Sequence, residues 1–442
     1  MTTTTTSTSL GPARVDAERL LDNLERLRAI GATREGGVTR RAFSQEDVKG
    51  QEFVAGLMRE AGLTVHVDAA ANLVGTRPGR DPDGPALVLG SHLDTVPGGG
   101  AYDGAYGVLA AVEVAHTLHE RGTPLDRPLT VMAFSNEEGT TGTPAMFGSR
   151  AVAGCLTPGE LQLPVDGQDR PLAQVLDAAG GDSRRVDDVR RPPGSVAAYL
   201  ELHIEQGPVL IGSGTEIGIV EGISGRLTAE VTVRGQANHA GTTPMTDRHD
   251  ALLAAARITV GVPGLTGPDG AVRVATVGDC RVSPGAWNVV PGVATLIVDL
   301  RDMSEDNLEA GLDRLRALGE EAARATGTSV DVAEVQRVSP TPCDTGRRAT
   351  VRRATDALGL SSVTLPSGAG HDAQWMARIA PTAMIFVPSE EGASHVPYER
   401  TAPADLVRGA DVLLGCTLLE GTAEREGTTA FEGPATLEGT TT

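Results

Sequence analysis

The feature that most constrains the fold of this chain is one strand–turn–helix segment. The apolar run at 86–90 is typical of a buried parallel strand and leads directly into His92. Apolar residues recur at helical spacing from 108 to 118, which predicts a helix that begins just after Asp103. The glycines at 98–100 allow a tight turn between the two elements. The strand end and the helix start therefore meet where open α/β sheets bind ligands, and we expect His92 and Asp103 to face one metal.

The length and charge of the chain narrow the class of protein. Its 442 residues are enough for two domains, and 40% hydrophobic content fits an ordinary globular protein. A formal net charge of −20 argues against binding to nucleic acid or to an anionic membrane, while a few local cations still allow a small anionic substrate. No apolar run reaches the ~18 residues needed to span a bilayer, and residues 1–9 lack the features of a signal peptide. We therefore expect a cytoplasmic protein.

The cysteines argue against one kind of zinc site. All four are far apart in sequence and show no Cys-x-x-Cys spacing: Cys155, Cys280, Cys343 and Cys416. A disulfide framework is not expected at this chain length. Any zinc ion would have to be held by histidine and carboxylate side chains.

A change of pattern divides the chain into domains. Residues 14–219 and 335–420 alternate buried strands with helices, which predicts an α/β domain with a mixed sheet flanked by helices, built from two pieces of sequence. Between them, residues 220–334 hold strands with a period of two and two helices, which is typical of a compact α+β insert. The ends, 1–13 and 421–442, are rich in Thr, Gly and Glu, so we expect disordered tails.

Side chains that bind metals follow the ends of three predicted strands and occur in one late loop. They are His92 with Asp94, the pair Glu137 and Glu138, His203 with Glu205, and His395. Catalytic zinc sites use nitrogen and oxygen ligands of this kind. Two ions ~3.5–4 Å apart need a bridging carboxylate, and Asp103 is placed for that role. Asp94, two residues after His92, could accept the far ring N–H of that histidine and fix its tautomer.

The adjacent glutamates allow two interpretations. Taken alone, Glu137 and Glu138 are better explained as two solvated acids at a strand end, because glutamate is mostly exposed. Neighbours on a strand point to opposite faces, but in a turn at the strand end both side chains can reach one cavity. One could then hold a metal while the other takes a proton from water.

The motifs in combination resemble the hydantoinase/carbamoylase family of amidohydrolases, which are dinuclear-metal relatives of aminoacylase and of carboxypeptidase-like metallopeptidases. The resemblance spans about residues 16–420. The segments that carry it are His92-x-Asp94, Asp103-Gly104, Asn136-Glu137-Glu138-Gly139, Glu201-Leu202-His203-Ile204-Glu205-Gln206-Gly207-Pro208 and Ser394-His395. None of these segments is specific by itself.

The resemblance implies a ligand set for two divalent metal ions per subunit. One ion would be held by His92, Asp103 and His203, and the other by Asp103, Glu138 and His395. Glu137 would be the general base, which later returns its proton to the leaving nitrogen. The ions would be Zn²⁺, or Mn²⁺, Co²⁺ or Ni²⁺, because a nitrogen and oxygen ligand set does not discriminate among them.

The resemblance also assigns roles to the insert, which would be a dimerisation and lid domain. His239 would reach the active site of the neighbouring subunit in a homodimer and stabilise the oxyanion, and Asn288 with Arg301 would bind the substrate carboxylate. Arginine offers a bidentate fork for that group. Without the resemblance, His239 would be an ordinary loop histidine, and Asn288 could equally be a turn residue or a binding residue. For Arg301 a binding role is favoured even then over an exposed position at a strand end.

Two further positions belong to the expected site. The glycine-rich segment 366–372 would line it with backbone groups available to the substrate, Gly370 among them. Gln206 would either support His203 or touch the substrate. His371 is not expected to be a ligand, although it could stand behind one.

The implied activity is hydrolysis of the carbamoyl C–N bond of N-carbamoyl-L-amino acids, which gives the L-amino acid, CO₂ and NH₃. β-Ureidopropionase and allantoate amidohydrolase activities are the alternatives, because they share these residues and differ in pocket shape. A catalytically inactive metal-binding homologue is the alternative from a different class. Retention of every ligand position and of Glu137 argues against it.

Overall fold

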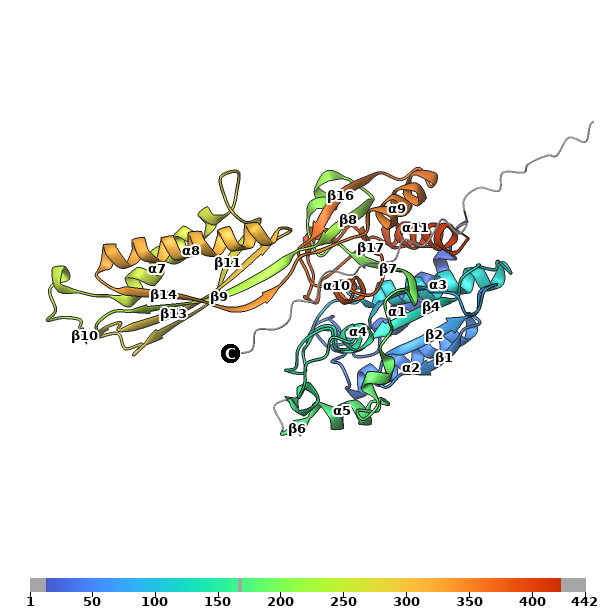
Figure 1. Cartoon of the computed structure of the whole chain (residues 1–442), viewed down its shortest axis with the longest axis horizontal. Coiled ribbons are helices and arrows are strands. Elements are labelled where there is room, and N and C mark those ends of the chain that lie inside the picture. Colours follow the sequence, from blue (N-terminus) through green and yellow to red (C-terminus); the bar gives the residue numbers. More distant parts are fainter. Residues whose placement is uncertain (1–12, 166–168, 423–442) are drawn as a thin grey trace, which may run out of the picture. The chain divides into compact units, whose positions relative to one another are not determined.

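The computed structural model describes residues 13–165 and 169–422, which form two compact units (Figure 1). The first unit contains the chain up to Glu221 and again from Cys343, and the second runs from Gly222 to Pro342. The predicted tails lie outside the described residues except at their inner ends. There Ala13 packs against the hydrophobic core and Gly421 ends the last helix.

The first unit is built on a mixed sheet. Its strand order is β1-β2-β4-β3-β7-β17-β8, with β16 also pairing β8. The pairs β3–β4, β3–β7 and β7–β17 are parallel, whereas β1–β2, β2–β4 and β17–β8 are antiparallel. The strands are β1 (Thr64–Val67), β2 (Leu73–Arg77), β3 (Ala86–His92), β4 (Leu129–Phe134), β7 (Val196–Ile204), β8 (Ile217–Ile223), β16 (Ser362–Ser367) and β17 (Thr382–Val387). Three of the four central strands, β3, β4 and β17, are buried along their whole length, as the apolar runs predict.

Helices flank this sheet. The long ones are α1 (Ala17–Arg28), α2 (Gln45–Glu60), α3 (Ala105–Glu120), α9 (Thr345–Ala357) and α11 (Pro403–Gly421). They share one hydrophobic core with β3, β4, β7 and β17, and α3 lies directly on the parallel strands. The shorter elements are α4 (Phe147–Ala153), α5 (Leu172–Ala178), α6 (Val209–Ser213), α10 (Ala373–Met376), β5 (Pro164–Val165), β6 (Arg170–Pro171), η1 (Glu160–Gln162), η2 (Val186–Val189) and η5 (Glu390–Gly392). A mixed sheet flanked by helices is the predicted architecture for this part of the chain.

The second unit is an antiparallel sheet with helices packed on its core. The strand order is β11-β13-β9-β14, and along β9 and β13 buried residues alternate with more exposed ones. Its elements are β9 (Gly225–Arg234), β10 (Asn238–His239), β11 (Val274–Ser283), β12 (Val289–Val290), β13 (Val293–Asp302), β14 (Ser329–Val338), β15 (Thr341–Pro342), α7 (Ala251–Gly261), α8 (Glu305–Thr326), η3 (Met245–Asp247) and η4 (Val262–Leu265). The end of β8 reaches this unit, where it pairs with β15.

The predicted end of the insert at 334 is too early, because it falls inside β14. The cause is local. The register of β14 against β9 shifts between Glu334 and Gln336, which is a bulge. A bulge interrupts the period of two on which the sequence boundary depends, so the strand appears to end there.

Two other sequence expectations concern the whole chain. All four cysteines are free, in agreement with the expected absence of a disulfide framework. Within the described ranges, none of the helices combines the length and the apolar character that crossing a bilayer requires.

Candidate metal centre

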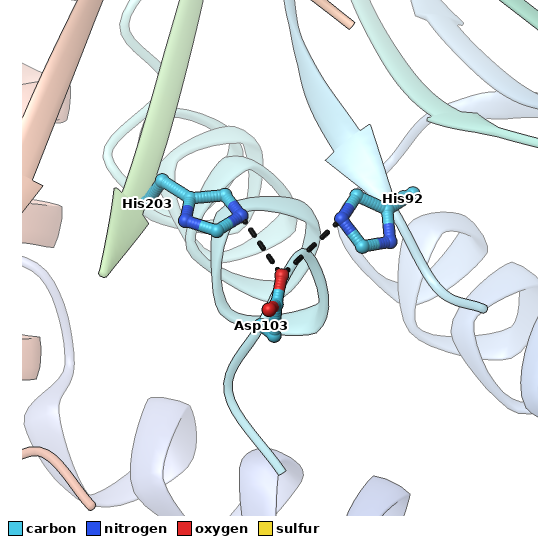
Figure 2. Close-up of side chains that lie close together, drawn as sticks. All are labelled: His92, Asp103 and His203. Atoms are coloured by element: carbon cyan, nitrogen blue, oxygen red, sulfur yellow. Dashed lines mark ion pairs between the residues drawn. The ribbon is translucent and has the colours of Figure 1, made fainter. Parts of the chain in front are cut away.

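The centre lies at the carboxyl ends of the parallel strands. His92 is the last residue of β3, His203 is next to last in β7, and Asp103 precedes α3 by two residues. Figure 2 shows both imidazole rings directed at Asp103. The Nε2 atoms of His92 and His203 lie 3.4 Å and 3.2 Å from Oδ1 of Asp103. Gly104 has a φ of +61°, and a Cβ atom there would collide with the His92 ring, so glycine is required at this turn.

Backbone carbonyls fix the tautomer of both histidines. Nδ1 of His92 lies 3.0 Å from the carbonyl oxygen of Asp94, and Nδ1 of His203 lies 2.9 Å from that of Ile204. A carbonyl only accepts hydrogen bonds, so each Nδ1 carries a proton, and in the neutral ring each Nε2 presents its lone pair towards Asp103. The N–H of Gly104 donates to Nε2 of His203 at 3.1 Å, which fits the same tautomer.

The Asp94 side chain does not make the contact with His92 that the sequence predicts. Its carboxylate oxygen is 3.8 Å from Nδ1 of His92, because its own carbonyl already occupies that position. The carboxylate instead accepts the backbone N–H groups of Glu137 and Glu138, both at 3.1 Å. The predicted contact through the Asp94 side chain is therefore wrong, and the side chain holds the glutamate pair in place.

A second group of side chains shares Asp103. Nε2 of His395 lies 3.2 Å from Oδ2 of Asp103 and 3.5 Å from Oε2 of Glu138. The first group therefore approaches one carboxylate oxygen of Asp103 and the second group approaches the other. In each group, His92, Asp103 and His203 or Asp103, Glu138 and His395, one ligand atom per residue lies within 4.8 Å of the others.

Burial of several carboxyl groups dominates the electrostatics. Burial, with the charge of Asp103, raises the pKa of Glu138 to about 7, and burial raises the pKa of Glu137 well above its usual range. Burial alone would raise the pKa of Asp103, but hydrogen bonds to His203, His395 and His92 hold it well below its usual range. The hydrogen bond to Asp103 raises the pKa of His395 to about 9.

This donor set fits divalent cations. In the described part of the chain, no arginine or lysine forms an ion pair with the carboxylates of Asp94, Asp103, Glu137 or Glu138. Buried carboxylates without cationic partners repel one another, and bound metal ions are the usual compensation. The Nε2 atoms of the histidines, in their neutral form, complete a coordination set of the zinc type.

Glu137 stands beside the cluster without belonging to either group. Its side chain is 8% exposed, and Oε2 lies 3.8 Å from Nε2 of His92. It follows β4 after Asn136, whose φ of +51° turns the chain at the strand end. This turn lets Glu137 and Glu138 point into one site, which is the second of the two interpretations of the pair.

Three buried residues lie behind His203, and of these the sequence anticipates only His371 in that place. The His371 ring packs edge-on against His203 with centroids 4.6 Å apart, and Glu201, His203 and His371 form a third cluster. Glu201 accepts hydrogen bonds from Ser91 and Tyr199. The signal for Glu201 was present, because residues two apart on a strand share a face. Asp372 is fully buried next to His371. The segment 366–372 predicts that this loop lines the site, but no pattern in the sequence indicates a role for the Asp372 side chain.

The other predicted site residues divide between the two units. Gln206 donates from Nε2 to Oδ2 of Asp103 at 2.7 Å, so it contacts a ligand of both groups instead of His203. Gly370 directly precedes the buried pair His371 and Asp372, which brings its loop to the centre.

His239, Asn288 and Arg301 belong to the second unit. His239 pairs with Val289 across β10 and β12, and the N–H of Ala240 donates to the Asn288 carbonyl at 2.9 Å, so these two segments are neighbours. Nε of Arg301 donates to Asp299 at 2.8 Å on β13. Their roles at the centre stay predictions.

A fully buried arginine anchors the loop that follows β3. Nε of Arg40 donates to the Leu93 carbonyl at 2.7 Å, and the backbone of Arg40 exchanges two hydrogen bonds of 2.9 Å with Thr95. Asp94 is therefore fixed from both sides. Asp47 and Asp94 are carboxylates near Arg40, and burial, with the charge of Asp94, raises the pKa of Asp47 to about 7.

Asp47 gives a test of stability against pH. Between pH 4 and pH 7 the folded protein keeps a proton on Asp47 that the unfolded chain has lost, so raising the pH through this range destabilises the fold. Asp47→Asn removes this cost. We expect the unfolding free energy of the variant, relative to the parent, to rise by about 2–3 kcal/mol between pH 5 and pH 8. Urea unfolding at both pH values measures it, with the exposed Asp22→Asn as control, and a constant difference would contradict the assignment.

A mixed sheet whose parallel strands bring histidine, aspartate and glutamate to one edge is an arrangement that metal-dependent hydrolases use. The model of Peptidase family M20/M25/M40 matches residues 88–418, and the chain belongs to this family. Within it the chain groups with the hydantoinase/carbamoylase amidases, as the sequence motifs predict.

Three similar proteins illustrate this relationship. The N-carbamoyl-L-amino acid amidohydrolase of Geobacillus stearothermophilus is 40% identical over 395 residues, which cover 89% of this chain and 96% of that protein. The allantoate amidohydrolase of Bacillus subtilis is 34% identical over 392 residues, covering 88% and 94%. The crystal structure of a hydantoinase/carbamoylase family amidase from Burkholderia multivorans superposes with a TM-score of 0.85 at 36% identity, covering 93% and 99%.

Proposed function

We propose that this enzyme hydrolyses the carbamoyl C–N bond of N-carbamoyl-L-amino acids to give the L-amino acid, CO₂ and NH₃. The observation that carries the proposal is the pair of ligand groups joined by Asp103, with the uncommitted carboxylate of Glu137 beside them. The similarity to an N-carbamoyl-L-amino acid amidohydrolase supports this substrate class.

Two divalent ions belong to this proposal. His92, Asp103 and His203 would hold one, and Asp103, Glu138 and His395 the other, with Zn²⁺, Mn²⁺, Co²⁺ or Ni²⁺ all compatible with the ligands. When bound, the ions act as Lewis acids that polarise the substrate carbonyl and make water more acidic. Asp94 keeps Glu137 and Glu138 in place through their backbone N–H groups.

Glu137 moves the proton in this mechanism. It takes a proton from the water that attacks the carbamoyl carbon, and it returns that proton to the nitrogen whose bond to this carbon breaks. The carbamate left on the other fragment then loses CO₂, so that the final products are the amino acid, CO₂ and NH₃. Two observations support this role: Glu137 is in neither ligand group, and its burial makes the carboxyl a stronger proton acceptor than an exposed one.

His239 would stabilise the oxyanion from the partner subunit of a homodimer, with the second unit as dimerisation and lid domain. Nδ1 of His239 accepts the N–H groups of Gly241 and Thr242 at 3.0 Å and 3.2 Å. In the neutral ring the proton therefore sits on Nε2, which makes this atom a hydrogen-bond donor. Such a donor is what a developing oxyanion requires.

Asn288 and Arg301 would bind the carboxylate of the substrate, and backbone groups of the loop at Gly370 would be available to the substrate. Nε of Arg301 is oriented by Asp299, and a guanidinium group suits a carboxylate by its planar fork. The proposed partner is a small anionic substrate, and neither nucleic acid nor a membrane takes part in the reaction. A cytoplasmic location stays a prediction.

A substrate panel tests the proposal. We expect the highest kcat/KM, by at least about tenfold, for N-carbamoyl-L-α-amino acids over their D enantiomers, N-carbamoyl-β-alanine and allantoate, since one well-placed contact is worth about 1–3 kcal/mol. The assays use protein loaded with each of the four metals. A preference for allantoate or N-carbamoyl-β-alanine would show that the proposed substrate class is wrong and would identify the preferred compound's class instead. Full metal occupancy with no turnover of any compound would identify an inactive metal-binding homologue.

A further inference from the structure

Glu399 connects two loops that carry metal-site residues. Its side chain is buried, and Oε1 accepts the backbone N–H groups of Tyr102 at 3.0 Å and Asp103 at 3.2 Å. Oε2 accepts the hydroxyl of Ser394 at 2.8 Å. Ser394 is the residue before His395. One carboxylate therefore links the turn that presents Asp103 to the loop that presents His395.

Ser394 extends this link to the Asp103 side chain. Its Oγ lies 2.9 Å from Oδ2 of Asp103, and Nε2 of Gln206 lies 3.3 Å from the same Oγ. A hydroxyl has one proton, so Ser394 donates to one of the two carboxylates at a time and accepts from Gln206. The four side chains form one connected network around the Oδ2 atom that faces His395.

The two ligand groups differ in how firmly their histidines are held. The side chains of His92 and His203 are 2% and 1% exposed, stand on strands and have Nδ1 fixed by carbonyls. The side chain of His395 is 49% exposed, and its backbone has a φ of +61°. A residue other than glycine in this region is strained and persists only where its surroundings hold it. His395 therefore depends on its neighbours more than the other two histidines do.

We propose that Glu399 is a positioning residue that holds Asp103 and His395 in the relative positions that a shared metal ion requires. Its loss then weakens the ion held by Asp103, Glu138 and His395 more than the ion held by His92, Asp103 and His203. This inference rests on the proposed two-ion function.

Gly100 offers an independent way to disturb the same group. A Cβ atom at Gly100 would overlap with the carboxyl end of Glu399, because the backbone passes directly against it. Gly100→Ala therefore displaces the Glu399 carboxylate without changing any polar side chain.

The test is the occupancy of the two metal positions in zinc-loaded protein, from anomalous diffraction of crystals and from stepwise zinc affinity in chelator competition. In Glu399→Ala, Ser394→Ala and Gly100→Ala, we expect zinc affinity at the Glu138–His395 position to fall about 10–100-fold and the other position to change less than about threefold. Glu399→Gln should restore part of the loss, because its amide oxygen can still accept both backbone N–H groups. Glu390→Gln, in the same loop and paired with Arg400, is the matched control.

The outcomes separate the inference from the function on which it rests. Equal weakening of both positions, or unchanged affinity in Ser394→Ala and Gly100→Ala, would overturn the role of Glu399 even if Glu399→Ala does not fold. A parent protein that binds fewer than two ions would overturn the two-ion proposal itself, and the role of Glu399 with it.

Discussion

Replacing Glu137 with glutamine should lower kcat by about 10²–10⁴-fold and leave the content of both metal positions unchanged. The magnitude is that of a missing general base. Metal binding should survive because Glu137 is in neither ligand group. The backbone N–H of Glu137 keeps its bond to Asp94, so the neighbouring Glu138 stays in place. Steady-state kinetics together with metal analysis of the same preparation measures both quantities.

The adjacent glutamate is the matched control for this experiment. Glu138→Gln makes the same chemical change one residue away, but it removes a ligand of the second group, so metal should be lost from that position. Both variants should have a low kcat, and their metal content should distinguish them. If Glu137→Gln lost metal as readily as Glu138→Gln, the assignment of Glu137 as an unligated base would be wrong.

The parts of the site that the sequence predicts are those in which a strong local pattern ends in a polar side chain. The apolar runs before His92 and Glu137 are unambiguous strands, and the buried helix after Asp103 follows from its spacing. Parallel strands end at the same edge of a sheet, and the three endings meet because β4, β3 and β7 are neighbours in the strand order. The structure brings together His92, Glu138 and His203 from these endings, with Asp103 from the helix start and His395 from the late loop.

The parts that the sequence does not predict depend on contacts between distant segments. Arg40 reaches the Leu93 carbonyl across 53 positions, and Glu399 reaches the N–H of Asp103 across 296. Neither residue stands in a pattern that indicates such a partner. The error at Asp94 has another source: the spacing of two residues from His92 was right, but spacing does not tell whether the carbonyl or the carboxylate meets the ring.

Mixing two inactive variants should restore activity if His239 serves the neighbouring subunit. His239→Ala alone should lose about 10²–10³-fold in kcat, the usual cost of one oxyanion donor. In a heterodimer with Glu137→Gln, one of the two sites combines an intact Glu137 from one chain with an intact His239 from the other. Random exchange makes about half the dimers mixed, each with one complete site, so about a quarter of the parent activity should return.

A second mixture shows whether such recovery comes from the trans arrangement. Glu137→Gln and Glu138→Gln both damage the site of their own chain, so their heterodimer contains no complete site, and mixing should restore nothing. If His239 acted within its own subunit, the His239→Ala and Glu137→Gln mixture would behave in the same way, because every site would carry one lesion. Recovery in the first mixture and not in the second requires a site built from two chains. If neither mixture recovers activity, although mass-tagged chains confirm that subunits exchange, then His239 does not act in the active site of the neighbouring subunit.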